Sequence, residues 1–377
     1  MKILIIGSDR ELFNQNSAVS KRTIEYAMVA GEISVIVFNV GLQQEIVLFD
    51  KVKVYPTNSL NKYLSVFDAI KIGAKIIKER GIEIISTQDP FEAGLAGLLL
   101  KKNTGVALNV QIHGDFFSNQ YYWRRSWLDK IRRQIAKKVL PGANSVRVVS
   151  QRVADSLSKF NIDQDKIVVA PIYVDTAKFT NQPATIDLRQ EFPGQFVILS
   201  VGRLVKEKNL GMLLEAVSQL VKKGSQVALA IAGKGEEEDS LKLKAQNLNL
   251  QGKVKFYGWL DNLGSFYKTA DVLAITSFAE GYNRTAVEAM SCGLPVIMTD
   301  VGLAGEIIKD QLNGLILKQA TAMDLASKIK ELTQNQELKK QLSIGASQTA
   351  QLLPNQQENL ALYLKSWQLA IENHGRQ

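Results

Sequence analysis

Short runs of β-branched and apolar residues alternate with helical patterns along the whole chain. Between the runs, apolar residues recur with the period of a helix, as at Leu210, Leu214 and Val217. Neighbouring parallel strands need a crossover connection, usually a helix, so this alternation predicts an α/β fold built on parallel sheets. The runs that we expect to form strands are residues 3–6, 33–38, 82–85, 106–112, 146–149, 196–201, 227–232, 254–257, 272–275 and 296–298.

The alternation stops once, in a polar stretch between residues 180 and 194. A chain of 377 residues is long for a single core, so we place a domain boundary in this stretch. The interpretation is two Rossmann-like domains, at residues 1–183 and 184–355. Residues 356–377 carry apolar side chains on one helical face, which predicts a final helix that packs back across the domain junction.

Composition excludes several classes of protein. A single cysteine rules out a disulfide framework, and two histidines leave little material for a metal cluster. The longest apolar run, at residues 93–100, is much shorter than a membrane span, and the first residues are typical of a strand rather than a signal peptide. We therefore expect a cytoplasmic protein.

Positive charge is concentrated in the first half of the chain. Residues 1–180 contain 25 Lys and Arg against 17 Asp and Glu, whereas the remaining residues contain 21 Lys and Arg against 20 Asp and Glu. The excess of basic residues in the first half predicts an anionic partner.

Ligands of doubly wound sheets bind beyond the carboxyl ends of the strands, so the loops after strands are the candidate sites. One such loop, after residues 272–275, holds Glu280 and Glu288 with a helix expected to begin near Arg284. Carboxylates accept hydrogen bonds from sugar hydroxyls, and a helix N-terminus offers free N–H groups to a diphosphate. Taken alone, the two acids also fit a turn residue and a buried helix acid.

A second loop, after residues 196–201, places Arg203 and Lys208 beside the turn into the next helix. Fixed cations at such a turn can neutralise a leaving diphosphate. Basic residues in turns are also commonly just solvated, so this loop alone does not identify a site.

The order of several short motifs carries a resemblance. The sequence contains, in turn, Gly202-Arg203 with Lys208, Ala232-Gly233-Lys234-Gly235, Tyr257-Gly258-Trp259, Ala270-Asp271, and Glu280-Gly281 with Glu288-Ala289-Met290 and Gly293-Leu294-Pro295. In this order they resemble the retaining glycosyltransferases of family 4, closely in the second half and loosely in the first. The resemblance implies the GT-B fold, in which two Rossmann-like domains face each other across a cleft. It also implies transfer of a sugar from a nucleotide-sugar, a substrate rather than a cofactor, to a saccharide or lipid-linked acceptor.

The resemblance also assigns roles to residues. It implies that Arg203 and Lys208 hold the donor diphosphate and that Glu288 holds the ribose. It also implies that Glu280 faces the sugar. His113, which follows residues 106–112, would lie near the transferred sugar, so His113, Glu280, Arg203 and Lys208 form the expected catalytic set. The expected donor-binding set is Gly202, Arg203, Lys208, Gly233, Gly258, Trp259, Glu280, Gly281, Tyr282, Asn283, Arg284, Thr285 and Glu288.

The sequence departs from the family pattern in places. The family often has glycine where Asn283 stands, which predicts a different floor of the sugar pocket. The glycine-rich loop after the first strand is reduced to Gly7-Ser8, and no dinucleotide-binding glycine motif follows Ile6, which argues against a nicotinamide enzyme. No Asp-x-Asp metal motif is evident, so we expect no metal and assign leaving-group stabilisation to the two basic side chains.

The segment from Tyr121 to Leu140 holds the best indication of the acceptor. It contains seven Lys and Arg against one Asp, and Trp127, Ile131 and Ile135 share one helical face. A basic helix with aromatic residues at one end suits an anionic bilayer surface, which predicts peripheral contact with the inner face of a membrane. The same stripe also fits a helix whose apolar face is buried in the domain core.

Three other interpretations stay open. Another GT-B enzyme, such as a sugar-nucleotide epimerase, would need acid–base groups at the sugar that the sequence does not locate. A catalytically inactive sugar-nucleotide sensor or scaffold fits Asn283, whereas the intact basic and acidic residues of the two loops favour an enzyme. The basic first half also fits nucleic acid, but no recognised binding module is present, and we expect no such partner.

Overall fold

The computed structural model describes residues 1–118, 121–122, 126–183 and 185–376. The chain divides into two compact units. The N-terminal unit comprises Met1–Pro171 with Asn355–Gln377, and the C-terminal unit comprises Ile172–Pro354.

The boundary between the units lies earlier than the predicted residue 183. The short helix α7 (Ala177–Thr180) belongs to the C-terminal unit and contacts its helices α11 (Gly264–Thr269) and α12 (Arg284–Ser291). Phe179 of α7 is buried, and its ring lies 5.8 Å from that of Tyr267 in α11. One buried aromatic side chain thus attaches this polar stretch to the second core.

A sheet in the order β3-β4-β2-β1-β5-β6-β7-β8 forms the centre of the N-terminal unit. Its neighbouring strands are parallel except β3 and β4, which are antiparallel. The strands are β1 (Lys2–Gly7), β2 (Glu32–Val37), β3 (Ile46–Phe49), β4 (Val52–Pro56), β5 (Ile84–Thr87), β6 (Ala107–Ile112), β7 (Ser145–Val148) and β8 (Ile167–Val169). The described helices are α1 (Ala18–Ala30), α2 (Ser65–Arg80), α3 (Glu92–Thr104), α5 (Trp127–Gly142), α6 (Gln151–Ser156) and α15 (Gln356–Gly375), with 3-10 turns η1 (Arg10–Phe13), η2 (Leu157–Phe160) and η3 (Gln164–Lys166).

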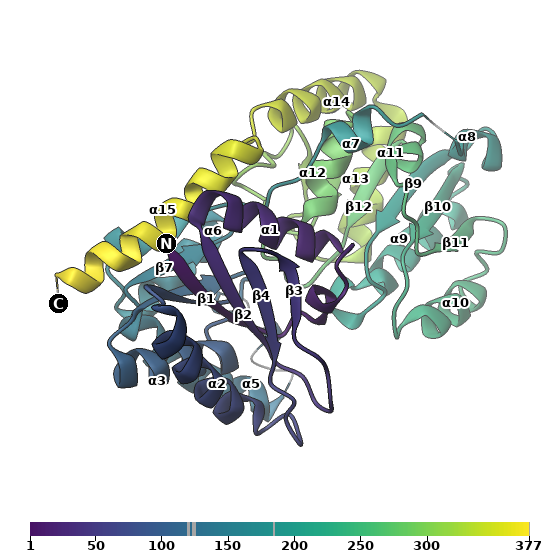
Figure 1. Cartoon of the computed structure of the whole chain (residues 1–377). Helices are drawn as coiled ribbons and strands as arrows, with labels where there is room; N and C mark the ends of the chain where they lie inside the picture. Colours follow the sequence, from purple (N-terminus) through teal and green to yellow (C-terminus); the bar gives the residue numbers. More distant parts are fainter. Residues whose placement is uncertain (119–120, 123–125, 184, 377) are drawn as a thin grey trace. The chain divides into compact units, whose positions relative to one another are not determined.

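The expected final helix is α15, and it is part of the N-terminal unit. It packs on β5 to β8 and on α1, while α2, α3 and α5 lie side by side elsewhere on the sheet (Figure 1). Trp367 is fully buried and its indole N–H donates to Ser86 Oγ of β5 at 3.2 Å. The C-terminal residues thus complete the core of the unit that the first residues begin.

The C-terminal unit is built on a second sheet in the order β11-β10-β9-β12-β13-β14, with parallel neighbours. Fully buried Leu213, Leu214 and Val217 of helix α9 pack in its hydrophobic core. The strands are β9 (Phe196–Val201), β10 (Val227–Ala232), β11 (Val254–Gly258), β12 (Val272–Ile275), β13 (Val296–Met298) and β14 (Leu315–Ile316). Besides α7, α11 and α12, the unit contains α8 (Leu188–Glu191), η4 (Lys206–Lys208), α9 (Leu210–Lys222), α10 (Glu238–Asn247), α13 (Ala322–Gln334) and α14 (Gln336–Gln351).

Candidate active site

Three glycines bring the carboxyl ends of β9, β10 and β11 close together. The φ angles of Gly202 and Gly233 are 146° and 148°, values that side chains rarely tolerate. A Cβ atom on Gly233 would lie 1.8 Å from the carbonyl oxygen of Gly202. The N–H of Gly233 donates to the Gly258 carbonyl at 2.7 Å. The glycines of the sequence motifs therefore permit the backbone approach that forms this edge of the sheet.

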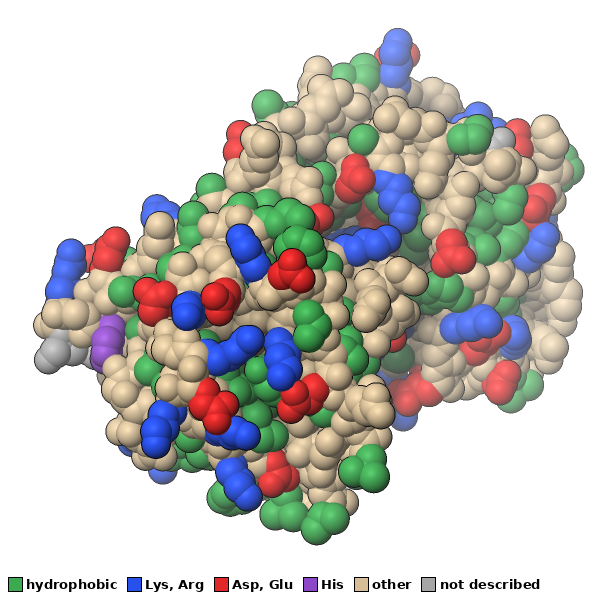
Figure 2. All heavy atoms as spheres, in the orientation of Figure 1, with side chains coloured by type: hydrophobic (Ala, Val, Ile, Leu, Met, Phe, Trp, Pro, Cys, Tyr) green, Lys and Arg blue, Asp and Glu red, His purple; other side chains and the backbone are tan. Residues whose placement is uncertain are grey.

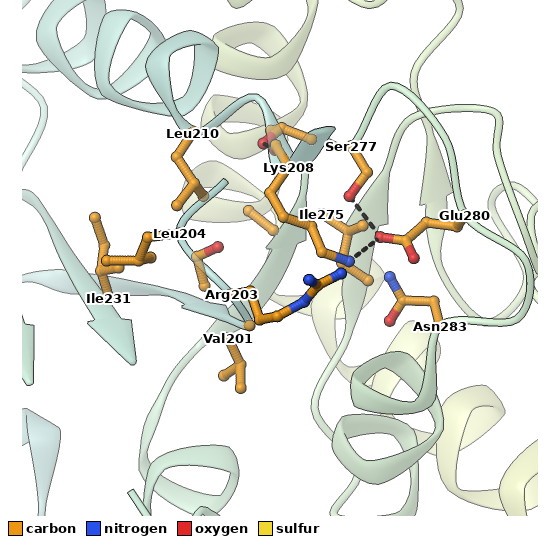
Figure 3. A pocket seen from close by; sticks show the side chains of 14 residues that line it. Val201, Arg203, Leu204, Lys208, Leu210, Ile231, Ile275, Ser277, Glu280 and Asn283 are labelled. Carbon is orange, nitrogen blue, oxygen red and sulfur yellow. Dashed lines mark hydrogen bonds and ion pairs between the residues drawn. The ribbon is translucent and has the colours of Figure 1, made fainter. Parts of the chain in front are cut away.

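A pocket opens at the carboxyl edge of the C-terminal sheet, with about 310 Å³ of empty space that is partly open to solvent (Figure 3). Its walls come from the loops after β9 and β12 and from the start of α12. The structure thus brings Gly202, Arg203, Lys208, Glu280 and Asn283 to one place. The lining residues are Ser200, Val201, Gly202, Arg203, Leu204, Lys208, Leu210, Ile231, Ala274, Ile275, Thr276, Ser277, Glu280 and Asn283.

An ion pair links the two loops across this pocket. Lys208 Nζ lies 2.6 Å from Glu280 Oε1, and the Ser277 hydroxyl donates to the same oxygen at 2.6 Å (Figure 3). The Glu280 side chain is 9% exposed and that of Lys208 24%. The backbone supports the arrangement, since Thr276 Oγ1 donates to the Lys208 carbonyl at 2.8 Å. The sequence identified both charged residues but not their pairing.

Arg203 differs from Lys208 in its surroundings. Its side chain is exposed at the pocket, and no carboxylate of the described residues lies within ion-pair distance of it. A guanidinium that is always charged and not neutralised by a neighbour is available to an anion.

Asn283 explains one departure from the family pattern. Its φ of 69° is in the left-handed region, which glycine adopts freely and asparagine tolerates better than most residues. It is also the N-cap of α12, because its Oδ1 accepts hydrogen bonds from the N–H of Ala286 at 3.1 Å and the Thr285 hydroxyl at 2.7 Å. Asparagine thus keeps the backbone conformation of a glycine and adds a cap.

Glu288 is buried in α12 and has a partner that the sequence did not indicate. The Tyr267 hydroxyl donates to Glu288 Oε2 at 2.8 Å, while Arg284 Nη2 lies 3.9 Å from Oε1. Burial is the main cause that raises the pKa of Tyr267 well above its usual value, and the negative charge of Glu288 adds to it. Tyr267 is therefore a permanent donor, which fixes one oxygen of the carboxylate.

The remaining donor-binding candidates are not among the residues that line the pocket. Tyr282 is buried, which raises its pKa to about 12, with a smaller contribution from the charge of Glu306. Trp259 is exposed. Gly281, Arg284 and Thr285 belong to the loop and first turn of α12, and Gly233 and Gly258 act through the backbone.

His113 lies in the N-terminal unit, directly after β6. Its Nε2 is 3.1 Å from Gln88 Oε1, and its Nδ1 is 3.3 Å from Arg147 Nη1. Burial is the main cause that lowers its pKa to about 3, and the charges of Arg147 and Arg22 act in the same direction. A Cβ atom on Gly7 would lie 2.8 Å from Gln88 Cγ, so this glycine makes room for the side chain that contacts His113.

The basic segment between Tyr121 and Leu140 divides into two parts. In α5, Trp127 is 66% exposed and Ile131 46% exposed, whereas Val139 and Leu140 are buried in the unit. The core-facing interpretation is thus wrong for the start of the helix and right for its end. On the face in Figure 2, basic and acidic side chains of this unit are intermixed. Arg124 and Arg125 lie outside the described residues.

Two features are absent from the described residues. No helix there is both long enough and apolar enough to cross a membrane. No group of three or more His, Cys, Asp or Glu side chains is arranged to hold a metal ion in that part of the chain. The sequence does contain one Asp-x-Asp spacing, at Asp163 and Asp165, which the expectation overlooked. Asp163 there is the N-cap of η3, because its Oδ1 accepts the Asp165 N–H.

Comparison with known families decides the class. The family described as "Glycosyl transferases group 1" matches residues 184–349, and that described as "Glycosyltransferase Family 4" matches residues 27–178. An uncharacterized glycosyltransferase of Methanocaldococcus jannaschii is 30% identical over 275 residues, which cover 73% of this chain and 72% of that protein. The chain belongs to glycosyltransferase family 4.

This glycosyltransferase resembles two further proteins. It is 28% identical over 255 residues to the alpha-monoglucosyldiacylglycerol synthase of Streptococcus pneumoniae; the match covers 64% of this chain but only 57% of that relative's length. The solved structure of Anabaena HepE in complex with UDP superposes with a TM-score of 0.75 over the full length of both chains, at 20% identity. The two parallel-sheet units of this glycosyltransferase are those of the GT-B fold.

Proposed function

We propose that this protein transfers a sugar from a nucleotide-sugar to a saccharide or lipid-linked acceptor, with retention of anomeric configuration and without a metal ion. The observation that carries the proposal is the pocket at the carboxyl edge of the C-terminal sheet. There, Arg203, Lys208 and Glu280 lie together beside the first turn of α12. The GT-B fold and the family match support the same reaction.

The two cations suit the negative charge that develops on the departing diphosphate. Preorganised charges act most strongly when they are aimed at the place where charge appears in the transition state. Arg203 is exposed, and Lys208 is held by Glu280 at the pocket wall. We infer that a bound diphosphate takes the hydrogen bonds of Arg203 and shares those of Lys208. These residues take the place of a divalent ion in the proposed mechanism.

The two carboxylates suit the hydroxyl groups of the donor. Glu280 uses Oε1 for Lys208 and Ser277, so Oε2 is the atom for a sugar hydroxyl. An acid so tightly paired with Lys208 is a weak nucleophile, and we assign it to positioning of the sugar. Glu288 is proposed for the ribose, with Tyr267 orienting its carboxylate. Since HepE was solved with UDP, a uridine nucleotide is the first candidate.

The acceptor is proposed to reside at an anionic membrane surface. The support is the exposed Trp127 and Ile131 at the start of α5, on the same helix as the exposed Lys130, Lys137 and Lys138. The name of the streptococcal relative includes a diacylglycerol glycolipid, which fits an acceptor of this kind.

Co-sedimentation with anionic and neutral vesicles tests this part of the proposal. Changing Lys130, Lys137 and Lys138 to Glu should abolish binding to anionic vesicles, because each basic residue near the surface contributes about 1 kcal/mol. Arg132 is left unchanged because it pairs with Glu92 at 2.9 Å. The same charge change at exposed Lys222, Lys223 and Lys330 of the C-terminal unit is the matched control. Equal binding by both triple variants would contradict the proposed surface.

A donor panel tests the enzymatic proposal. UDP-, GDP- and ADP-sugars are compared for thermal stabilisation, since a ligand of the folded state raises the melting temperature. The stabilising donor is then assayed for transfer and hydrolysis in EDTA, with the anomeric configuration of the product read by NMR. Retention without added metal is expected. Binding without any turnover would favour the inactive sensor, and a strict requirement for Mg²⁺ or Mn²⁺ would refute the assigned role of the cations.

A further inference from the structure

Strand β7 carries a fully buried arginine, Arg147. Arg147 is 0% exposed, and no carboxylate of the described residues lies within ion-pair distance of its guanidinium. Burial of an unpaired charge destabilises a fold unless other contacts compensate. The contacts that Arg147 makes therefore indicate why the fold retains it.

Arg147 is held on two sides. Its Nη2 donates to the carbonyl oxygens of Ala170 and, at 3.2 Å, Pro171 at the end of β8. Its guanidinium lies over the ring of Tyr363 in α15, 4.2 Å from the ring centroid. That ring is stacked on Tyr26 of α1 at 4.6 Å. Carbonyl oxygens and an aromatic face are the groups that stabilise a cation in the absence of an acid.

The remaining Arg147 contact determines the state of His113. A guanidinium has only donors, so Nη1, 3.3 Å away, donates to Nδ1 of the histidine and Nδ1 carries no proton. The proton is then on Nε2, which donates to Gln88 Oε1 at 3.1 Å. We propose that Arg147, held by Tyr363 of the C-terminal helix, is a positioning residue that fixes His113 as the neutral, Nε2-protonated tautomer. His113 is thereby a hydrogen-bond donor and not a proton acceptor.

The groups around the ring favour the neutral form. Arg147 from β7 and Arg22 from α1 are the cations that oppose its protonation, in addition to burial. Burial also raises the pKa of Tyr26 well above its usual value, so Tyr26, which is stacked on Tyr363, brings no negative charge. The nearby carboxylates have other partners: Asp89 accepts the N–H of Phe91 and of Ala93, and Asp115 accepts from Ser118.

One consequence concerns the reaction. If His113 lies at the transferred sugar, it cannot take the proton of the acceptor hydroxyl, because Nδ1 accepts from Arg147 and Nε2 carries the proton. Donation to an oxygen of the sugar would require the Nε2–H to leave Gln88 Oε1. That consequence rests on the proposed function. The state of the ring does not, because it follows from the N-terminal unit alone.

The protein has two histidines, so NMR can test the ring state directly. In protein labelled with ¹⁵N at histidine, His374→Gln assigns the signals, and the ring-nitrogen shifts identify the tautomer. We expect the wild-type His113 to stay neutral and Nε2-protonated from about pH 8 to about pH 5. In Arg147→Met, the pKa should rise by about one unit or more and the other tautomer should appear. Arg147→Lys, which keeps a charge and a donor, should lie between the two.

A control separates this effect from loss of stability. Trp367 is on the same helix as Tyr363, and Trp367→Phe removes its hydrogen bond to Ser86 of β5 while keeping an aromatic ring, so this variant should leave the tautomer unchanged. If Arg147→Met does not fold, Tyr363→Leu serves instead and should weaken the tautomer preference. The pH profile of kcat/KM should gain an acid limb in Arg147→Met that Trp367→Phe lacks.

A wild-type His113 that titrates near pH 6.5, or one protonated on Nδ1, would overturn the proposal. An unchanged tautomer and an unchanged pKa of His113 in folded Arg147→Met would also overturn it. If the ring behaves as expected but His113→Ala transfers sugar normally, the assignment of the tautomer stands and the proposed place of His113 at the sugar fails.

Discussion

Replacing Lys208 by Met tests the ion pair at the centre of the donor pocket. The substitution removes the charge that lies 2.6 Å from Glu280 Oε1 and keeps much of the side-chain volume. It leaves a carboxylate that is 9% exposed with the Ser277 hydroxyl as its hydrogen-bond donor. An uncompensated charge at a mostly buried position destabilises the folded state.

The magnitude follows from the exposure of the two partners. Removal of one member of a buried pair costs about 3–5 kcal/mol, whereas exposed pairs contribute about 1 kcal/mol or less. Because Lys208 is 24% exposed, we expect a loss of about 2 kcal/mol, which lowers the melting temperature of a unit of this size by roughly 4–8 °C. Lys208→Met combined with Glu280→Gln should recover most of the loss, since the unpaired charge is then gone.

Differential scanning calorimetry of the wild type, both single variants and the double variant measures the coupling. Lys242→Met is the matched control, because Lys242 lies at the same 2.6 Å from Glu238 but on the surface, and it should cause no measurable change. The reasoning is refuted if the effects of the two pocket substitutions simply add, or if Lys208→Met is no more destabilising than the control.

Three further results are expected. Arg203→Ala should lower the rate of transfer about 100-fold at saturating donor while leaving the melting temperature unchanged, and a near-normal rate would contradict its place at the diphosphate. Asn283→Gly should hardly change the melting temperature. Asn283→Val should destabilise the folded state by more than about 1 kcal/mol, because valine cannot cap the helix and a φ of 69° strains its backbone. Equal stability of the two variants would count against this explanation. Burial raises the pKa of Asp89 from 3.8 to about 6, so the folded state binds the proton more tightly and the N-terminal unit should lose stability as the pH rises through this range. Asp89→Asn keeps an acceptor oxygen and should remove that pH dependence in denaturant titrations; an unchanged slope would refute the assignment.

Buried strands were predictable because a parallel strand that is covered on both faces has a continuous run of apolar residues in its sequence. Each of the ten expected runs overlaps a strand, although the run at residues 82–85 begins two residues before β5. The strands that were not predicted lack this signal: burial alternates along β3, at the sheet edge, and along β4, and β8 and β14 have three and two residues. The error in the domain boundary has a similar cause, since one buried side chain, Phe179, attaches a polar stretch to the second unit.

The candidate site was predictable as far as its residues follow strands of one sheet. Lys208 and Glu280 are 72 positions apart but come after strands β9 and β12, which are neighbours, so their proximity follows from the topology. Tyr267 and Arg147 could not be identified this way. Tyr267 contacts Glu288 from another helix, α11, and Arg147 contacts His113 while it is held by Tyr363 of α15. These contacts depend on tertiary packing, which leaves no pattern in the sequence.

Isothermal titration of UDP, GDP and ADP in the presence of EDTA tests the central claim most directly, because it measures whether the C-terminal pocket binds a nucleoside diphosphate without a metal. The wild type should bind at least one of the three, and Arg203→Ala should weaken that binding about 10-fold or more, as expected for a charge-assisted contact with phosphate. His113→Ala, in the other unit, should leave the affinity unchanged. Absence of binding to all three diphosphates, or binding that Arg203→Ala does not alter, would contradict the account.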